Sequence, residues 1–381
     1  MSRLTLGFVP LLDCAPLVAA AERGFAAEEG LELTLVRESS WASIRDRLIV
    51  GHFDAAHMLG PMTVASTLGI GHIRTPIIAP CALGLGGNAI AVSLRLWSQM
   101  RQEGAAAGSP ATMQGIALRR VLARRAREDR DPLTFGIVYP FSCHNYELRY
   151  WLAAAGVEPE RDVRLVVIPP PLLGEAIRAG QIDGFCAGEP WSSVAVDTGL
   201  AAIVNSTAAI WPSSPEKVLG CRAQWAEQHP AELRALIRAL YRAAQWCERP
   251  ENHSELAMLL AEPRHVGISA PVLLRGLSGR LTLTPYGDAE ALADFYLPAS
   301  RWATFPWTSH ALWYYTQMVR WRQIELVAEH PVLAAGSYRP DIYRAALAPL
   351  GVELPPGETK VEAFFDNRVF DPSDLVGWLG G

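Results

Sequence analysis

The sequence contains almost no lysine. Of the 34 basic residues in the 381-residue chain, only Lys217 and Lys360 are lysines, and the others are arginines. Lys217 lies between two tryptophans in the segment WPSSPEKVLGCRAQW, residues 211–225. Arginine would offer a wide planar fork suited to carboxylate or phosphate, whereas lysine offers a compact ammonium. We therefore treat Lys217 as a candidate for binding a small anion.

Other features that the sequence lacks exclude whole classes of protein. No segment approaches the ~20 apolar residues needed to span a bilayer. The net charge of −5 gives no overall basic character of the kind that favours nucleic acid. The densest basic run, RRVLARRAREDR at 119–130, is interrupted by two acidic residues and contains no aromatic residue. We interpret it as a solvated helix face and not as an RNA-binding patch.

The cysteines and the first residues bear on the cellular location. The six cysteines are scattered, with no C-x-x-C pair and no zinc-site spacing, so we interpret them as reduced thiols. The opening segment, MSRLTLGFVPLLDCAPLV, contains no uninterrupted apolar region and no lipobox-like cysteine after one. From these patterns we expect a cytoplasmic protein.

Two stretches of the first half have the same order of features. LTLGFVPLLDCAPLVAAAERG (residues 4–24) contains an apolar strand, a turn with Asp13 and Cys14, a helix and a final glycine. LTFGIVYPFSCHNYELRYWLAAAG (133–156) repeats this order, with His144 at the start of its helix. Each stretch continues with a β-rich run, a helix, and a glycine followed three residues later by an aspartate. The pattern predicts strand–helix–strand–helix–strand twice.

Alternating strands and helices of this length predict an α/β fold in which mostly parallel sheets are flanked by helices. Two copies predict two similar domains that face each other across a ligand cleft, since such sheets bind ligands beyond the carboxyl ends of their strands. A glycine-rich segment between the copies indicates a hinge. We place domain I at residues 1–87 and 191–381, with a helical C-terminal extension, and domain II at residues 88–190.

A catalytic site built on cysteine is one interpretation of the two turns. Cys14 and Cys143 lie at the starts of predicted helices, where the pKa of a thiol falls, and His57 and His144 are candidate partners for a nucleophile. The sequence contains no G-x-S-x-G, H-E-x-x-H or P-loop motif and no helical pair of metal ligands. We interpret the cysteines as buried structural thiols and expect neither catalysis nor a cofactor or metal.

The other interpretation is a pocket for a small monoanion with one formal charge. Trp41 opens a predicted helix and offers a flat ring, and His144 opens another and donates from a ring nitrogen. Helix N-termini add a favourable field for an anion. Gly188 allows close approach of the backbone, Asn88 begins a strand after the hinge, and Lys217 supplies the charge. We predict that these five residues form one anion site.

Several segments resemble one known family. GFVPLLDCAPLVAAAERGFAAEEGL, SWASIRDRL, DAAHMLGPM, CHNYELRYWLAAAG, FCAGEPW and SPEKVLG are similar to segments of the nitrate/nitrite- and bicarbonate-binding proteins of the NrtA/CmpA type, over roughly residues 4 to 300. The resemblance implies the two-domain, type II periplasmic-binding-protein-like fold. It also implies an anion site formed by Trp41, Asn88, His144, Gly188 and Lys217. A lysine at position 217 favours nitrate or nitrite, because bicarbonate-type members have there an acidic residue that works with a bound metal.

Within this resemblance, the sequence as given is most similar to the cytoplasmic nitrate/nitrite sensors of the NasS type. Such a sensor is expected to hold an RNA-binding antitermination regulator of the NasT type and to release it when nitrate or nitrite closes the two domains. The chain itself is then expected to contact neither nucleic acid nor a membrane. Two alternatives stay open. One is the substrate-binding component of a nitrate/nitrite ABC transporter, and the other is a cysteine-dependent, desulfinase-like enzyme on the same fold.

Overall fold

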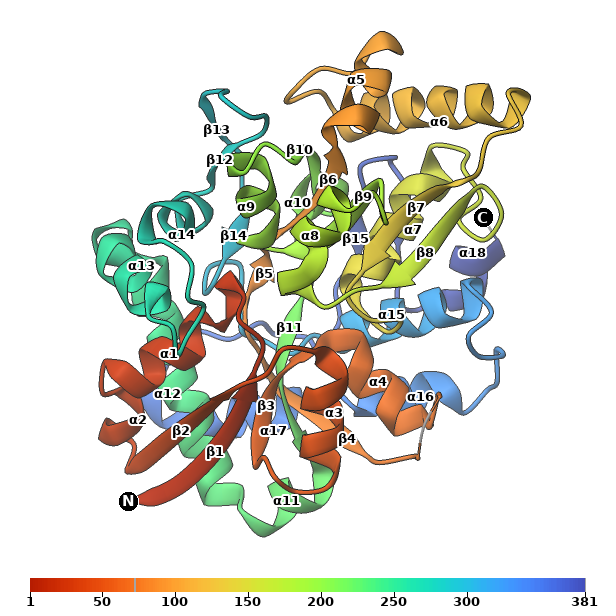
Figure 1. Ribbon diagram of the computed structural model, residues 1–381. Coiled ribbons are helices and arrows are strands. Elements are labelled where there is room, and N and C mark those ends of the chain that lie inside the picture. Colours follow the sequence, from red (N-terminus) through yellow and green to blue (C-terminus); the bar gives the residue numbers. More distant parts are fainter. Residues whose placement is uncertain (72, 381) are drawn as a thin grey trace.

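Two five-stranded sheets form the body of the protein (Figure 1), whose computed structural model describes residues 1–71 and 73–380. The first sheet has the strand order β2–β1–β3–β11–β4 and the second the order β10–β6–β9–β7–β8. The strands of the first sheet are β1 (Ser2–Phe8), β2 (Leu31–Arg37), β3 (Ala55–Leu59), β4 (Ile77–Ala82) and β11 (Lys217–Arg222). Those of the second are β6 (Asn88–Ser93), β7 (Leu133–Ile137), β8 (Val163–Val167), β9 (Gly184–Gly188) and β10 (Ala201–Ser206).

Helices flank both sheets and build the C-terminal part. The helices that follow strands of the first two-thirds of the chain are α1 (Ala15–Glu22), α2 (Phe25–Glu28), α3 (Trp41–Ile49), α4 (Gly60–Leu68), α5 (Leu94–Gln102), α6 (Ala111–Arg127), α7 (Cys143–Ala154), α8 (Leu173–Arg178), α9 (Trp191–Asp197), α10 (Thr207–Ile210) and α11 (Ala223–Gln228). The later ones are α12 (Pro230–Glu248), α13 (His253–Ala261), α14 (Ala270–Leu277), α15 (Thr308–Arg320), α16 (His330–Gly336), α17 (Pro340–Leu347) and α18 (Leu375–Gly380). Short elements connect them: η1 (Leu12–Cys14), η2 (Pro170–Leu172), η3 (Pro250–Asn252), η4 (Ala348–Leu350), β5 (Leu85–Gly86), β12 (Arg280–Thr282), β13 (Ala289–Ala291), β14 (Tyr296–Leu297), β15 (Glu362–Ala363) and β16 (Val369–Phe370).

The strand directions confirm the predicted α/β class with mostly parallel sheets. β1 runs parallel to β2 and β3, whereas β11 runs antiparallel to both β3 and β4. The second sheet has the same arrangement, with β7 parallel to β8 and β9 and with β6 antiparallel to β9 and β10. In each sheet, therefore, one strand is reversed and the others share a direction.

The internal repeat is confirmed by a hydrogen bond that occurs in both sheets. The backbone N–H of Thr5 donates to Asp54 Oδ2 at 2.8 Å, and that of Thr134 donates to Asp183 Oδ2 at 2.9 Å. In both pairs the aspartate follows the threonine by 49 residues. The glycine–aspartate signal that was found in the sequence therefore marks the same connection between neighbouring parallel strands in each half.

The chain passes twice between the two sheets. It leaves the first sheet after β4 through β5, where Gly86 has a φ of 70° and a Cβ would lie 2.3 Å from the Phe295 carbonyl oxygen. It returns after β10 through α10. Because β10 pairs with β6, residues 201–206 lie in the second sheet, beyond the residue at which we placed the return to domain I. How the chain divides into domains stays a prediction, and its last residue, Gly381, lies outside the described residues.

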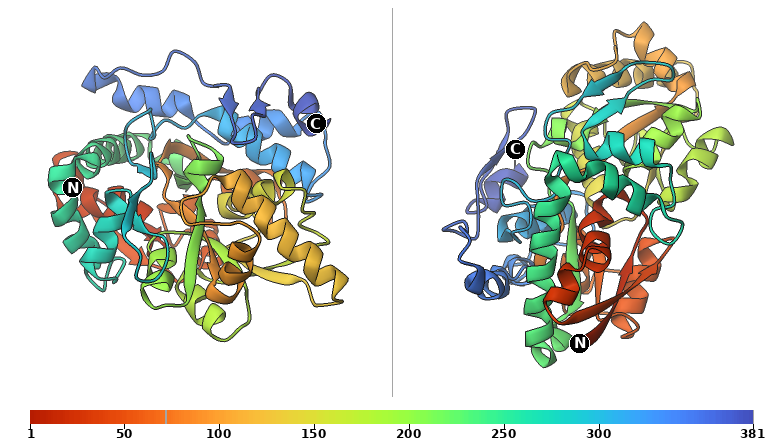
Figure 2. Two further views of the ribbon diagram at one scale, coloured as in Figure 1. Left: turned by 90° about the horizontal axis from the view of Figure 1, so that it is seen from above. Right: turned by 90° about the vertical axis from the view of Figure 1, so that its left-hand side faces the viewer.

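The C-terminal part, from α15 onward, forms a layer along one side of the molecule (Figure 2). An aromatic cluster joins this layer to the rest. Tyr150 of α7 stacks on Trp378 of α18 with ring centroids 6.1 Å apart, and Trp313 of α15 stacks on Phe364 at 5.8 Å. Since α7 flanks the second sheet and α15 packs on α4 of the first, the cluster connects both halves.

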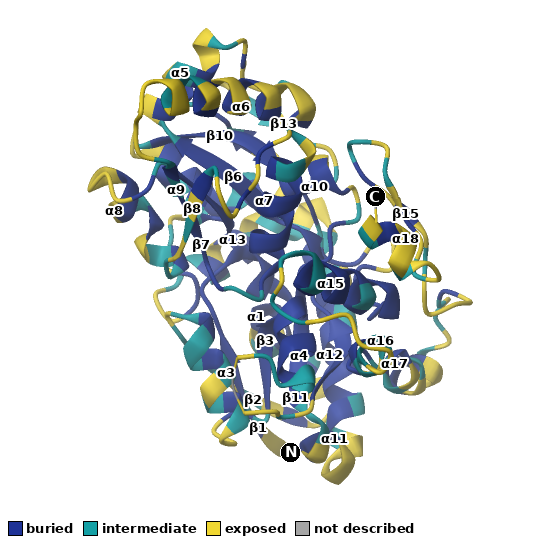
Figure 3. Ribbon diagram, turned by 90° about the vertical axis from the view of Figure 1, so that its right-hand side faces the viewer, coloured by how far each residue is buried: buried dark blue, intermediate teal, exposed yellow. Residues whose placement is uncertain are grey.

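Burial follows the sheets. Both sheets and α7 are largely buried, whereas α6 and the outer C-terminal elements show many exposed residues (Figure 3). Among the described residues, no helix has the length and apolar character that crossing a lipid bilayer requires.

Candidate functional site

Two capped helix N-termini hold the aromatic residues of the predicted site. Trp41 is the first residue of α3, and the extended Ser40 before it accepts a hydrogen bond from the backbone N–H three residues on, at 3.2 Å. His144 lies in the first turn of α7, where Ser142 makes the equivalent bond at 3.1 Å. Each cap satisfies one of the free N–H groups of its helix and fixes where the helix starts. The predicted positions of both side chains at helix starts are confirmed.

Lys217 and Asn88 occupy equivalent positions in the two sheets. Each is the first residue of the reversed strand, β11 or β6. Lys217 lies opposite Leu59, the last residue of β3, and Asn88 lies opposite Gly188, the last residue of β9. Because β3 and β9 end at the carboxyl edge of their sheets, both side chains are placed where the two sheets meet.

The Lys217 ammonium is paired with two carboxylates. Its Nζ donates to Asp13 Oδ2 at 2.7 Å and to Glu216 Oε2 at 2.5 Å. It also lies 5.7 Å from the centre of the Trp41 ring, whose face attracts cations. Our expectation of a pocket with one formal charge is therefore wrong, because two acidic side chains share the lysine.

Glu216 links this pair to the residues from the second sheet. Asn88 donates Nδ2 to Glu216 Oε1. His144 Nε2 lies 3.9 Å from Glu216 Oε2. A Cβ at Gly188 would lie 3.2 Å from Asn88 Oδ1, which places that backbone against the amide. The structure thus brings all five predicted residues into one cluster, with Lys217 and Glu216 at its centre.

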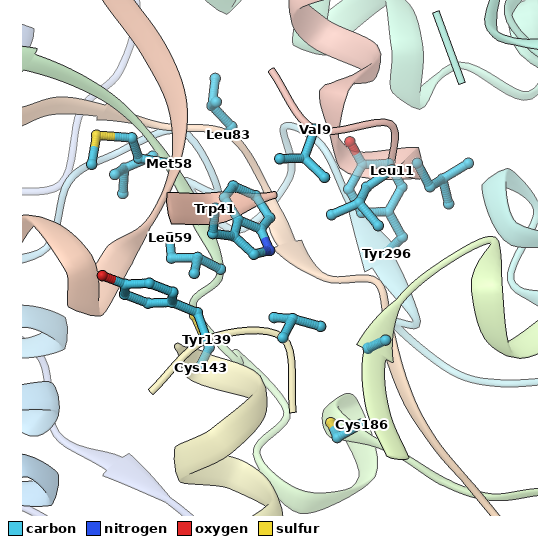
Figure 4. Packing of buried hydrophobic residues seen from close by; sticks show 14 of the residues in the cluster. Val9, Leu11, Trp41, Met58, Leu59, Leu83, Tyr139, Cys143, Cys186 and Tyr296 are labelled. Carbon is cyan, nitrogen blue, oxygen red and sulfur yellow. The ribbon is translucent and has the colours of Figure 1, made fainter. Parts of the chain in front are cut away.

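The cluster is buried and contains unpartnered polar atoms. Trp41 is 1% exposed, and Asn88, His144 and Lys217 are fully buried. Figure 4 shows the Trp41 indole surrounded by apolar side chains that include Val9, Leu11 and Leu59. Within the part of the chain that the structure describes, the atoms of these residues without a hydrogen-bond partner are Trp41 Nε1, Asn88 Oδ1, and His144 Nδ1 and Nε2. Buried polar groups are normally paired, so these atoms indicate a missing partner.

The electrostatics of the cluster are set by burial and by Lys217. Burial raises the pKa of Asp13, but Lys217 and His57, whose Nε2 lies 2.9 Å from Asp13 Oδ1, lower it by more, so that this pKa falls well below its usual range. Burial lowers the pKa of Lys217, but both carboxylates raise it, and the net change is upward. Burial, with Lys217, holds the pKa of His144 far below its usual value. The cluster therefore contains an ammonium, an Asp13 carboxylate and a neutral imidazole.

Asp13 and Glu216 are the site residues that sequence reasoning missed. Glu216 is the neighbour of Lys217 in SPEKVLG, and neighbours in a strand point to opposite faces. The strand begins only at Lys217, so this rule does not apply to Glu216. Asp13 was noted only as part of a turn, and it pairs with a residue 204 positions further along the chain. Asp13 could have been predicted as a site residue from one feature of the sequence: it is an acidic residue in a loop that was expected to border the cleft.

The cysteines do not have the properties of nucleophiles. Cys14 and Cys143 are fully buried, and burial raises the pKa of both thiols above the usual value. The Cys143 thiol donates to the Glu216 carbonyl oxygen at 3.3 Å. A nucleophilic cysteine needs a lowered pKa and access to substrate. Among the described residues, no group of three or more histidine, cysteine or acidic side chains is arranged to hold a metal ion.

Comparison with known proteins places this geometry in a family. The profile of the NMT1-like family matches residues 1–261. The chain belongs to this family. Its curated relatives include the nitrate/nitrite binding protein NrtA of Synechococcus elongatus, 32% identical over 99% of this chain and 85% of that protein. They also include the nitrate import ATP-binding protein NrtC of Synechocystis, 35% identical over 99% of this chain. The chain spans 54% of NrtC, about half of its length.

A solved structure agrees over the whole chain. The crystal structure of the periplasmic nitrate-binding protein NrtA from Synechocystis superposes with a TM-score of 0.92 at 26% sequence identity, covering 100% of this chain and 98% of that one. The two-domain periplasmic-binding-protein fold and the resemblance to the NrtA type are confirmed. These relatives are binding proteins and transport components, in agreement with our expectation that the chain is not an enzyme. Closeness to the NasS-type sensors stays a prediction.

Proposed function

We propose that this chain binds nitrate or nitrite between its two sheets, as the substrate-binding component of an ABC-type importer. The observation that carries the proposal is the set of unpartnered buried polar atoms around one ammonium: the Trp41 indole N–H and the two ring nitrogens of His144, of which one carries a hydrogen in the neutral imidazole. The names of the relatives, a nitrate/nitrite binding protein and a nitrate import component, support the same ligand class and the same role.

The geometry suits a small planar monoanion. Lys217 supplies the positive charge, the indole N–H of Trp41 donates from the first sheet, and a ring N–H of the neutral His144 donates from the second. The starts of α3 and α7 add the favourable field of two helix N-termini. A guanidinium would present a wider planar fork than the compact ammonium does.

Binding is expected to require separation and closure of the two halves. Trp41 and Lys217 belong to the half built on the first sheet, and Asn88, His144 and Gly188 to the half built on the second, and all five residues are buried. An anion reaches them only when the sheets move apart about the two crossing segments. Contacts to both halves then favour the closed form, which is the general logic of a hinged binding protein.

A second candidate is the cytoplasmic NasS-type sensor, which holds an RNA-binding antiterminator of the NasT type until nitrate or nitrite binds. The names of the relatives support the importer more than the sensor, because NrtC is named for nitrate import and the NrtA of known structure is named as a periplasmic protein. If the chain is a sensor, we expect it to form a stable complex with a small RNA-binding regulator, and nitrate should dissociate this complex. If it is part of an importer, we expect it to bind a membrane permease. Pull-down from membrane and soluble fractions, with and without nitrate, distinguishes the two roles and bears on location.

Calorimetry against nitrate, nitrite and bicarbonate tests the ligand. We expect 1:1 binding of nitrate or nitrite, no binding of bicarbonate, and loss of binding in Lys217→Ala. Lys360→Ala is the matched control, because Lys360 is the other lysine and pairs with Glu362 at 2.7 Å, outside the site. Anion binding that survives in Lys217→Ala, or that bicarbonate alone produces, contradicts the proposal.

A further inference from the structure

Glu216 is the residue whose place in an anion site requires explanation. Its carboxylate accepts from Lys217 at 2.5 Å and from Asn88, and the residue is 3% exposed. A second carboxylate, that of Asp13, lies 2.7 Å from the same ammonium. Lys217 therefore already faces two carboxylates before any anion enters.

The other groups around Glu216 do not balance this charge. The titratable groups that face it are Asp13 on η1, Cys143, His144 and Glu147 on α7, Cys186 on β9, Lys217 on β11, Tyr314 on α15, and Tyr338 before α17. Of these groups, only Lys217 carries a positive charge at neutral pH, because burial keeps the His144 imidazole neutral. An anion would give the ammonium a third negative neighbour. Buried charge without a partner costs several kcal/mol per ion.

We propose that the anion binds together with a proton, which Glu216 takes up from solvent. The inference rests on the proposed function, since it assumes that a monoanion binds beside Lys217. The proton removes one negative charge from the cluster and leaves the ammonium between Asp13 and the ligand. The ligand itself does not hold the proton, because nitrate is the anion of a strong acid.

Asn88 gives the proton a second effect. While Glu216 is ionised, Asn88 donates its Nδ2 to Oε1, and its Oδ1 has no partner among the described residues. An acceptor oxygen repels an anion. When Glu216 carries a proton, its O–H can donate to Asn88 Oδ1 after the amide turns over, and the amide N–H groups then point away from Glu216. The proton thus frees the Asn88 N–H groups from Glu216.

The pKa values separate Glu216 from the other carboxyl groups. Burial raises the pKa of Glu216, Lys217 lowers it in part, and the result is about 7. Lys217 and His57 hold the pKa of Asp13 far lower, so Asp13 stays ionised. Burial and the neighbouring Glu216 hold the pKa of Glu147 well above its usual range. The contacts with Lys217 and Asn88 distinguish Glu216 from Glu147 in this cluster.

Calorimetry in buffers of different ionisation enthalpy tests the inference. We expect nitrate binding to the wild-type protein at pH 8 in HEPES and in Tris to show uptake of about one proton. The dissociation constant should be constant at acidic pH and should rise up to about tenfold per pH unit above pH 8. Glu216→Gln, which mimics the protonated side chain, should bind nitrate without proton uptake and without this pH dependence.

Glu189→Gln is the matched control. Glu189 is also buried, and burial raises its pKa to about 7, but its carboxylate accepts from the Ser193 N–H at 3.3 Å and makes no contact with Lys217. This variant should keep the wild-type proton uptake. Uptake that disappears in Glu189→Gln, or that persists in Glu216→Gln, assigns the proton to another group and overturns the inference.

The outcomes separate this inference from the proposed function. Nitrate binding without proton uptake by the wild-type protein overturns the inference and leaves the proposed function standing. Failure of nitrate, nitrite and bicarbonate to bind at any pH overturns the proposed function itself. If Glu216→Gln does not fold, a nitrate-induced difference infrared spectrum of Glu189→Gln decides: a gain of the protonated-carboxyl band supports the inference, and no gain contradicts it.

Discussion

Lys217 and Asp13 form a buried ion pair in which the ammonium nitrogen lies 2.7 Å from a carboxylate oxygen and both side chains are at most 3% exposed. Such a pair has a specific energetic character. Its net contribution to stability is small, because burial costs both partners their hydration, but removal of one partner is expensive, because the other charge stays buried. The consequences differ for the two residues and can be measured separately.

Replacement of Lys217 by methionine should destabilise the protein by about 3–5 kcal/mol, because Asp13 loses its ammonium partner within the fold. Urea unfolding at pH 7 measures the loss. The double variant Lys217→Met, Asp13→Asn should recover part of it, since no buried charge is then left alone at Asp13. Lys360→Ala should stay within about 1 kcal/mol of wild type, because its ion pair is partly exposed. If Lys217→Met is as stable as the wild-type protein, the folded state does not depend on the Lys217 ammonium to compensate the buried charge of Asp13.

Asp13 should make the folded protein sensitive to acid. Its pKa is lowered in the folded protein, so its stabilising effect is fully present above the unfolded-state pKa of about 4 and is lost as the pH falls further. Asp13→Asn should therefore be less stable than wild type at neutral pH, and this difference should shrink below about pH 4. Thermal melts from pH 7 to pH 2 follow both proteins. If the stability difference between Asp13→Asn and wild type is constant from pH 7 to pH 2, Asp13 is not the source of the acid sensitivity.

Glu189 should have the opposite pH dependence. Burial raises its pKa from 4.5 to about 7, so the folded state binds more protons than the unfolded state between these values. The stability that this group contributes is therefore present at low pH and is lost as the pH rises through 7. The unfolding free energy falls by about 3 kcal/mol over this range. Relative to wild type, Glu189→Gln should gain stability as the pH is raised from 4 to 8. Urea unfolding of both proteins at pH 4 and pH 8 measures this change. If the difference in unfolding free energy between variant and wild type is the same at both pH values, the prediction is wrong.

Trp41→Phe should weaken nitrate binding by about tenfold or more, because phenylalanine keeps an aromatic ring but lacks the indole N–H that would donate to the charged ligand. Calorimetry gives the dissociation constant. Trp307→Phe is the control: its Nε1 is also buried without a partner among the described residues, but its ring packs on Phe305, just before α15. If the two variants bind nitrate with equal affinity, the indole N–H of Trp41 does not contribute to the site.

Local patterns in the sequence were enough to predict much of the architecture. The repeated strand, turn and helix, and the Gly–Asp spacing, gave both sheets, because these features depend on residues close together in the chain. The helix starts at Trp41 and His144 were also predictable, since serine is a strong N-cap. The predicted cluster of five residues followed from two helix starts, a glycine, the strand after the hinge and the rare lysine, and from the resemblance to the NrtA/CmpA type.

What could not be predicted depends on contacts between distant segments. The Lys217–Asp13 pair joins positions 204 residues apart, and Asn88 reaches Glu216 across 128 residues. Neither contact has a spacing that a single sequence reveals. The sheet to which β10 belongs is likewise set by its pairing with β6 and not by its own composition.

The equivalent positions of Asn88 and Lys217 have a consequence for the origin of the site. Two sheets with the same strand order, the same reversed strand and the same threonine–aspartate bond are what duplication of one half-chain produces. In a precursor made of identical halves, these two positions would have carried the same side chain on either side of the ligand. In this chain the two positions differ, with an ammonium on one side and an amide on the other. The two equivalent strand starts therefore give the ligand site its asymmetry of charge, although the sheets that hold them have the same order.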